Sequence, residues 1–539
     1  MGHGALARKG STAFSLPVAV ALLTILTLSA AEGKQAAFPS QRLPTDSWIY
    51  DDLEKLVLLE AVDHIPLDTR PLARADVAAL LSRALQADAS FGRNPVAARL
   101  LREFAWELKR MGLSSPYEDT EPFMVVGDGG RFLRNYMVAS GRLKAAPELD
   151  SRFGESSELG FEISLFLLPH LFVYEDLFVT EVPESEGVGD AIVAHTDLLL
   201  MTDRLYATLR TDHLDLTFGR DNVRWGPGRS GTLLLSDAAP PFFILGYRAR
   251  LGESIVGEAI HGTLNAFEGR YVAGHRVELR LGRDLTVGLA ESVRYDSPSV
   301  EPLYVIGIVP YALVEKLLYR DTISEGKAGH NQRNNLLQGI DVTWRPGGGS
   351  ELYGELLVDD VSTESSEMPS RIAYQGGAKK IWKIAERLFI LQGEYTRVWN
   401  YTYSVYYGRD FQHRDSPLGY LQGPDSENLT FWIDVDAGMQ WSLQLEGNLT
   451  RKGEGEIGKP WCPEDFDSES CAVCGRTDAS DLSGVVESGR ALTARVIWNP
   501  RDNLRASMGL GVMNVRSEKH VEGSDRVYPV LEAGLRARW

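Results

Sequence analysis

The sequence predicts an all-β protein, a large transmembrane antiparallel β-barrel of about 16–18 strands, with an α-helical bundle ahead of it. Three observations lead to this fold class. After about residue 120, apolar and polar residues alternate along the chain, as in strands with one apolar face. Beyond the first 31 residues, no apolar run approaches the length of a membrane-spanning helix. The last residues, LEAGLRARW, keep the same alternation up to Trp539.

Residues 1–31 have the pattern of a secretory signal peptide. Arg8 and Lys9 precede an apolar run over 14–28, and the small residues Ser29, Ala30 and Ala31 follow it. We expect cleavage near Ala30 or Ala31. The alternative is an uncleaved anchor, although the run is short for one.

Residues 46–115 predict a helical bundle, which we expect at the periplasmic mouth of the barrel. The first helix has Asp46 or Ser47 as its N-cap, and apolar residues follow at helical spacing. The third has Asn94 as its cap, a proline at the first helical position and Gly112 as its stop.

Residues 120–539 predict the barrel itself. In residues 429–446 the apolar residues from Leu429 to Leu445 share one parity, and a polar set that includes Asp434 and Asp436 shares the other. So long a segment exceeds one membrane-crossing strand, which predicts a hairpin turning at residues 437–439. Similar hairpins are predicted with short turns at 211–213, 282–284, 346–349 and 499–502.

Between the hairpins lie long, polar, aromatic-rich segments, at 220–242, 295–337, 359–370, 399–427, 451–489 and 514–525. Short turns that alternate with long loops are typical of an outer-membrane barrel, whose turns face the periplasm and whose loops face outward. In a soluble sandwich, the alternative, loop lengths need not segregate in this way. The terminal strand then turns its apolar face toward lipid, and Trp539 matches the C-terminal aromatic signal that barrel-assembly machinery recognises.

Four segments carry a resemblance to a known family: residues 218–241 (FGRDNVRWGPGRSGTLLLSDAAPP), 266–279, 351–360 and 416–429. Together and in this order they resemble the Wzi-type capsule-assembly proteins of Gram-negative outer membranes. The resemblance implies a closed barrel of about eighteen strands with a periplasmic helical bundle at its mouth. It also implies a non-enzymatic, lectin-like protein of the cell outer membrane that holds capsular or extracellular polysaccharide. The cysteine-containing segment 462–474 departs from the pattern we associate with this family.

Glycan binding requires aromatic faces for sugar CH groups and polar groups for hydroxyls. The candidate residues are Tyr401, Tyr403, Tyr406, Trp225 and Arg224. For the tyrosines, the alternative is a girdle at the membrane interface. For Arg224 and Trp225, we expect instead that they fold a loop inward together with Arg220 and Asp221.

The first of the four segments also predicts a structural motif. We expect it to fold inward and to pair with lumen carboxylates such as Asp434, Asp436 or Glu355. Its members are Arg220, Asp221 and the turn Gly226-Pro227-Gly228.

The remaining features exclude other classes. A net charge of -18 argues against a nucleic-acid partner. Neither HExxH nor GxSxG occurs, and we expect no catalytic residues, no metal and no cofactor. The three cysteines lie together, and we expect a local disulfide among them, with zinc as the alternative: Cys462, Cys471 and Cys474. The alternative function is an outer-membrane porin or substrate channel.

Overall fold

The structure is a computed structural model of the whole chain. It describes residues 38–63, 65–112, 124–125, 131–144, 152–181, 191–192, 198–252, 254–318, 334–360, 369–384, 387–405, 409–438, 440–459, 479–501 and 504–538. The predicted signal peptide, the three cysteines, Tyr406 and Trp539 lie outside these residues.

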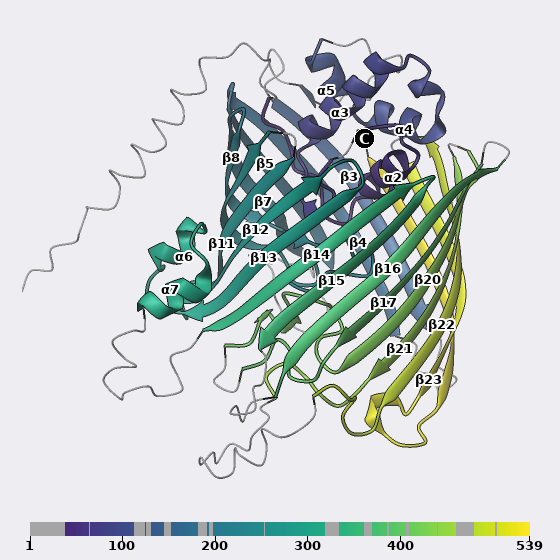
Figure 1. Cartoon of the computed structure of the whole chain (residues 1–539). Helices are drawn as coiled ribbons and strands as arrows, with labels where there is room; N and C mark the ends of the chain where they lie inside the picture. Colours follow the sequence, from purple (N-terminus) through teal and green to yellow (C-terminus); the bar gives the residue numbers. More distant parts are fainter. Residues whose placement is uncertain are drawn as a thin grey trace, which may run out of the picture.

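The N-terminal part is helical, as the sequence predicts (Figure 1). The side chain of Ser47 accepts from the amide of Ile49 and caps the first helix, and Asn94 caps a later one. Apolar side chains of these helices form one core. The elements are α2 (Trp48–Leu58), β1 (Thr69–Arg70), α3 (Arg74–Ala87), η1 (Phe91–Arg93), α4 (Pro95–Glu103) and α5 (Ala105–Arg110).

The barrel is a closed antiparallel sheet that contains eighteen long strands and two short ones within the described residues. The ring closes where β24 pairs with β3, with Leu531 opposite Leu143. The long strands are β3 (Arg131–Lys144), β4 (Arg152–Leu168), β5 (Leu171–Glu181), β7 (Leu198–Arg210), β8 (Leu214–Asp221), β10 (Phe242–Leu251), β11 (Ile255–Asn265), β12 (Arg270–Leu281), β13 (Leu285–Asp296), β14 (Asn335–Gly347), β15 (Ser350–Asp360), β16 (Arg371–Ile384), β17 (Arg387–Val398), β20 (Ser426–Asp436), β21 (Trp441–Lys452), β22 (Glu487–Arg501), β23 (Leu504–Arg516) and β24 (Arg526–Arg538). The short ones are β2 (Met124–Val125) and β6 (Ala191–Ile192).

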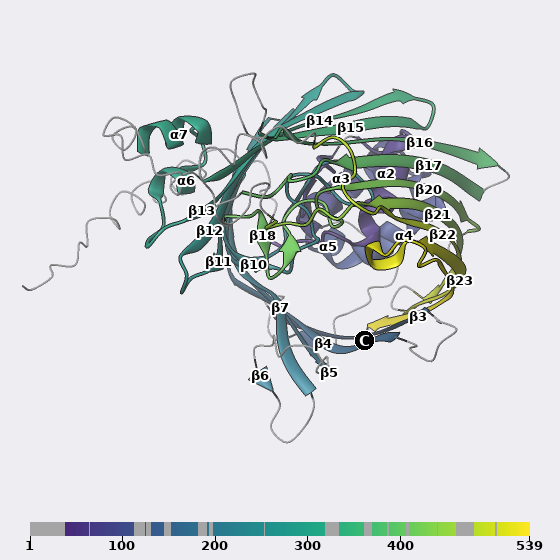
Figure 2. The ribbon, with the colours of Figure 1, turned by 90° about the horizontal axis from the view of Figure 1, so that it is seen from below.

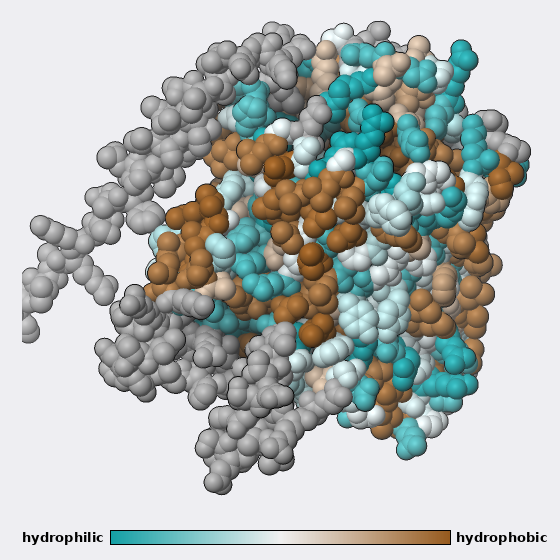
Figure 3. All heavy atoms as spheres, viewed as in Figure 1, coloured by the Kyte–Doolittle hydropathy of each residue, from teal (hydrophilic) through white to brown (hydrophobic). Residues whose placement is uncertain are grey.

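The alternation predicted for the strands is confirmed on the hairpin β20–β21. Phe431 and Leu443 are 47% exposed on the outside of the barrel, whereas Thr430 and Trp432 are buried toward the lumen. Apolar residues also cover much of the outer face seen in Figure 3. An apolar exterior around a polar lumen is the arrangement of an outer-membrane barrel, which confirms the predicted fold class.

Apart from the four-residue connection 266–269 at the long-loop end, short and long connections lie at opposite ends of the barrel. We call these the short-turn end and the long-loop end. The turns 211–213 and 282–284 separate β7 from β8 and β12 from β13, as predicted. The N-terminal helices lie at the short-turn end, where the amide of Gly348 donates to Glu60. Among the described residues, no helix is long and apolar enough to cross a membrane.

One predicted loop contains structure that the sequence analysis did not anticipate. Two helices, α6 (Pro302–Ile306) and α7 (Tyr311–Leu318), lie within the segment 295–337, which the alternation pattern assigns to an irregular loop. They pack beside β11, β12 and β13 on the outside of the barrel (Figures 1 and 2).

Candidate functional site: the filled lumen and its outer loops

Residues 222–241, which connect β8 to β10, fold into the lumen, and we call them the inward loop. Within this loop β9 (Arg224–Trp225) pairs with β1 of the N-terminal part, with Trp225 opposite Thr69. The next amide, of Gly226, donates to the carbonyl of Asp68 at 2.8 Å. The inward loop and the N-terminal part therefore form one continuous filling inside the barrel.

Lumen carboxylates hold the inward loop, as the sequence analysis predicts, but through different partners. Asp434 of β20 pairs with Arg229 at 3.0 Å. Glu394 of β17 accepts from the amides of Arg229 and Ser230 at 2.7 and 3.0 Å. Glu355 of β15 accepts from the amide of Leu233 at 3.3 Å. The loop is thus fixed by charge-assisted hydrogen bonds to several walls of the barrel.

Arg220 and Asp221 have different positions from those expected. Arg220 lies on the outward face of β8, between two residues that are buried on the inward face. Its side chain donates to the carbonyl of Pro241 and points away from the lumen carboxylates. Asp221 faces inward and is 1% exposed. It pairs with Arg42 of the N-terminal part at 3.2 Å. The outward direction of Arg220 follows from strand parity, because β8 extends to Asp221.

The turn Gly226-Pro227-Gly228 fits closely against the wall. A Cβ atom added to Gly226 would lie 2.0 Å from the carboxylate of Glu355, and the φ angle of this residue is +127°. One added to Gly228 would lie 1.9 Å from the side chain of Gln375. Both positions therefore exclude a side chain, and the turn serves to bring the backbone against the lumen wall.

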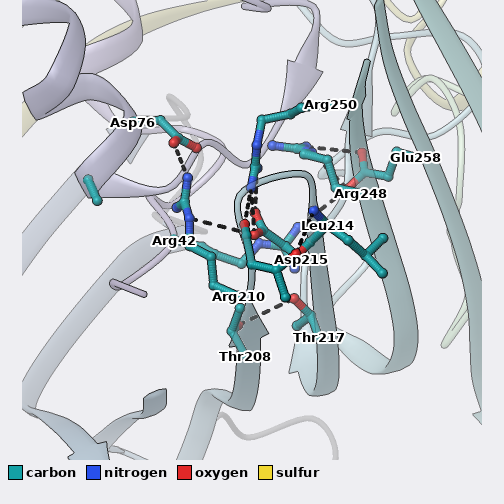
Figure 4. Close-up of polar contacts among 12 residues, drawn as sticks. Arg42, Asp76, Thr208, Arg210, Leu214, Asp215, Thr217, Arg248, Arg250 and Glu258 are labelled. Atoms are coloured by element: carbon teal, nitrogen blue, oxygen red, sulfur yellow. Dashed lines mark hydrogen bonds and ion pairs between the residues drawn. The ribbon is translucent and has the colours of Figure 1, made fainter. Parts of the chain in front are cut away.

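One side of the lumen holds the N-terminal part through arginines of the barrel strands. Arg210 of β7 contacts Asp76 of α3 and lies 3.6 Å from Asp215. Arg250 of β10 donates to the same Asp215 through two nitrogens, at 2.7 and 2.8 Å. Figure 4 shows these residues with their neighbours in the network, which are Arg42, Thr208, Leu214, Thr217, Arg248 and Glu258.

Arg248 of β10 connects this network to backbone carbonyl groups of the N-terminal part. It donates to the carbonyl of Pro71 at 2.7 Å and pairs with Glu258 at 3.1 Å. Glu258 also accepts from the indole of Trp225 at 3.0 Å. Removing one partner from a buried pair of this kind costs about 3–5 kcal/mol, so the network strongly favours the docked position of the N-terminal part.

The opposite side of the lumen holds the helices through Asp436 of β20. This carboxylate lies 2.9 Å from Lys55 of α2 and 3.3 Å from Arg99 of α4. Asp52 of α2 pairs with the same two cations at 3.2 and 2.8 Å. Burial alone would lower the pKa of Lys55, but the carboxylates of Asp52 and Asp436 raise it above its usual value. The N-terminal helices are therefore attached to the barrel on both sides.

A second loop fills the other end of the lumen. It comprises the described residues 399–405 and 409–425 between β17 and β20, includes β18 (Gln412–His413) and β19 (Ser416–Pro417), and we call it the outer loop. Figure 2, seen from this end, shows it within the ring of strands. The hydroxyl of Tyr403 donates to the carbonyl of Leu233 in the inward loop at 2.6 Å. The amide of Ser236 in turn donates to the carbonyl of Leu418 at 2.8 Å.

Apolar packing joins the two loops. Trp225 and Leu233 of the inward loop lie in one buried cluster with Tyr403, Phe411 and Leu418 of the outer loop. The two loops therefore pack directly against each other inside the barrel. The lumen is thus occupied by the helices, the inward loop and the outer loop in succession.

Asp425 connects the outer loop to the next loop along the chain. It is completely buried, and its carboxylate accepts from the amide of Gly455 at 2.9 Å and from the hydroxyl of Ser483 at 2.5 Å. The amide of Asn400 donates to the carbonyl of Ala479 at 3.0 Å. Among the described residues, the loops at the long-loop end are therefore interlocked by hydrogen bonds.

The candidate glycan-binding residues are not gathered on one surface. Tyr403, Trp225 and Arg224 are 0%, 1% and 6% exposed, so the packing of the lumen covers their side chains. Arg224 donates to the carbonyl of Gly228 within the inward loop. Tyr401 is partly exposed at the long-loop end, with a φ angle of +66°. Burial of Tyr403 had no signal in the sequence, since alternating tyrosines there also fit an interfacial girdle.

A cavity of about 350 Å³ lies between the helices and the barrel wall. Charged side chains line it, among them Asp51, Lys55, Arg99, Asp434 and Arg505. Among the described residues, no group of three His, Cys, Asp or Glu side chains is placed to hold a metal ion.

No protein-family model and no curated protein matches this sequence. Among solved structures, the chain is similar to Wzi of Escherichia coli, described as a carbohydrate-binding β-barrel of the outer membrane involved in group 1 capsule assembly. Identity is 16%, coverage is 92% of this chain and 99% of that one, and the TM-score is 0.60.

Two further solved structures have lower TM-scores. OccAB2 of Acinetobacter baumannii has a TM-score of 0.44 at 8% identity, with 76% of this chain and 98% of that one covered. OprD of Pseudomonas aeruginosa has a TM-score of 0.42 at 8% identity, with 78% and 97% covered. The chain thus has the fold of an outer-membrane β-barrel, and its predicted resemblance to the Wzi type is confirmed at the level of the fold.

Proposed function

We propose that this protein is a non-enzymatic, lectin-like outer-membrane protein that anchors or organises capsular or extracellular polysaccharide at the cell surface. The observation that carries the proposal is the filled lumen. Helices, inward loop and outer loop occupy it in succession, joined by backbone pairing of β1 with β9 and by the Tyr403–Leu233 hydrogen bond. A filled lumen disfavours a passive channel and leaves the outer loops as the surface on which a ligand can act.

The orientation of the molecule belongs to this proposal. After signal cleavage the N-terminal helices start in the periplasm, and an even number of strands returns the C-terminus there. The short-turn end is then periplasmic and the interlocked loops face outward. We infer that barrel-assembly machinery acts on the C-terminal strand and that outer-membrane lipid surrounds the apolar exterior.

The similarity to Wzi supports polysaccharide as the ligand class, since that protein is described as carbohydrate-binding. Weak binding at single sites becomes strong retention when a polymer repeats the same unit many times. Of the candidate residues described, Tyr401 is the one that the fold leaves partly accessible at the long-loop end. We therefore assign glycan contact to Tyr401, and to Tyr406 from the sequence, and assign a structural role to Tyr403, Trp225 and Arg224.

The test compares cell-bound with released polysaccharide in an encapsulated host that lacks the protein and is complemented with variants. Tyr401→Ser together with Tyr406→Ser removes two stacking faces, each aromatic contact being worth about 0.5–1.5 kcal/mol. The matched control is Phe267→Ser, because Phe267 is a fully exposed aromatic residue on a different loop. Heat-modifiable migration on gels first establishes that each barrel folds.

The expected result is polymer of unchanged total amount and length that moves into the medium in the double variant and not in the control. Polymer of altered length or composition would show that the protein processes its ligand instead. Equal retention in the deletion strain and in the complemented strain would refute the anchor.

A further inference from the structure

The helices α6 and α7 fold back along the outside of the barrel. They follow the long-loop end of β13, yet they pack against β11, β12 and β13 and do not cover the mouth (Figure 1). The hydroxyl of Tyr247 on β10 donates to the carbonyl of Ile306 at the end of α6. The amide of Tyr311 at the start of α7 donates to Glu291 of β13 at 2.7 Å. Both helices are therefore tied to the outer wall.

The wall beneath the helices is built to receive them. Glu291 has the outward parity of Leu289, which is 47% exposed, and an outward carboxylate on a membrane barrel is costly. Here it binds the first amide of α7, where the helix dipole favours negative charge. It also lies 3.5 Å from His275 on β12. On β11, His261 lies 2.6 Å from the hydroxyl of Tyr295. The helices thus cover these polar groups together with an apolar cluster of the outer wall.

Helix α7 is apolar on two faces. Tyr311 and Val314 are fully buried against the wall. On the opposite face, Leu313 and Leu317, one turn apart, are 50% and 65% exposed. Ile308, which precedes the helix, is 77% exposed. These three side chains form an exposed apolar surface, which no protein covers among the described residues.

The apolar surface of α7 continues the apolar exterior of the barrel. Leu245 of β10 is the register partner of His261, beside the covered area, and is 44% exposed. On the other side, Ile340 of β14 pairs with Leu289 and is 41% exposed. Figure 3 shows apolar residues where α6 and α7 lie and on the strands beside them. The band that contacts lipid on either side therefore runs across the helix pair.

We propose that α6 and α7 form a lipid-binding element, with Leu313, Leu317 and Ile308 inserted among the acyl chains of the leaflet next to the long-loop end. The occupant is lipid hydrocarbon, because the surface consists of leucine and isoleucine side chains and is continuous with the apolar exterior of the barrel. At this place the two helices contact lipid, and they shield from it the part of the wall that carries Glu291, His261 and His275. This inference does not depend on the polysaccharide.

The test is spin labelling at single cysteines in the full chain reconstituted in phospholipid nanodiscs, after replacement of the three native cysteines by serine. Labels are placed at Leu313 and Leu317. Leu445, exposed on the outside of β21, is the lipid reference, and Glu522, exposed in the β23–β24 loop, is the water reference. Collision rates with molecular oxygen, which enters lipid, and with a water-soluble nickel chelate are measured by power saturation. Heat-modifiable migration establishes that every labelled barrel is folded.

The proposal predicts that labels at Leu313 and Leu317 resemble Leu445, with oxygen collisions raised and nickel collisions reduced relative to Glu522. Nickel collisions equal to those at Glu522 would overturn it and place the helices in water. Low collision rates with both reagents, together with dipolar broadening between labels, would also overturn it, because a second copy of the chain would then cover this surface.

Discussion

Replacing Asp436 with alanine should weaken the attachment of the N-terminal helices to the barrel. Asp436 is 5% exposed and accepts from Lys55 and Arg99 across the boundary between wall and helices. Loss of one partner of a buried ion pair costs about 3–5 kcal/mol. Lys55 and Arg99 both remain paired with Asp52 in this variant, and the adjacent cavity can admit water. The expected loss of docking free energy is therefore at the lower end of this range, about 3 kcal/mol. That free energy corresponds to roughly a hundredfold shift in the docking equilibrium.

The assay is amide hydrogen exchange measured by mass spectrometry on the folded barrel. Peptides from α2 and α4 should exchange faster in Asp436→Ala, by up to roughly a hundredfold where exchange follows undocking. The matched control is Glu446→Ala, because Glu446 pairs with Arg495 of the neighbouring strand at 2.6 Å, so this variant removes an ion pair within the wall. Unchanged exchange of α2 in Asp436→Ala, or an equal change in the control, would refute the reasoning.

Three further predictions test the fold and its attachments. Leu445→Arg puts a charge on the outward band of β21 and should destabilise the barrel by about 2–4 kcal/mol in urea titrations, whereas lumen-facing Gln444→Arg should cost less; the reverse order would contradict the register. Burial would raise the pKa of Glu54, but Lys379 lowers it to about 2, with Glu351 and Arg70 also nearby. Protection of α2 should therefore be complete above about pH 4.3 and fall as the pH drops toward 2, and Glu54→Gln should reduce this dependence, since Asp436 also holds α2. Trp539→Lys should reduce the heat-modifiable, folded fraction, and an unchanged fraction would count against the C-terminal signal.

The strands and their turns were predictable because period-two alternation directly encodes a wall with one apolar and one polar face. Leu443 and Thr430 face the sides that their parity assigns. The same rule places Arg220 outward, once β8 is known to continue to Asp221. The end of this strand was not predictable, because polar residues follow Phe218 both in the strand and in the loop after it.

The filling of the lumen and the helix pair were less predictable. Arg229 pairs with Asp434 because of the path that the inward loop takes across the lumen. No local sequence pattern predicts that path. Tyr403 is buried by residues such as Leu233, 170 positions away in the chain. Helix α7 is one eight-residue segment, too short for a clear helical period, and its stability comes from packing on the wall.

The central claim is that the lumen is closed by the helices and the two loops, and single-channel conductance in a planar bilayer tests it most directly. The intact protein should show no steady open level, and removal of residues 46–112 should raise conductance only as far as the inward and outer loops allow. A steady open pore of porin size in the intact protein would contradict the account and favour a substrate channel.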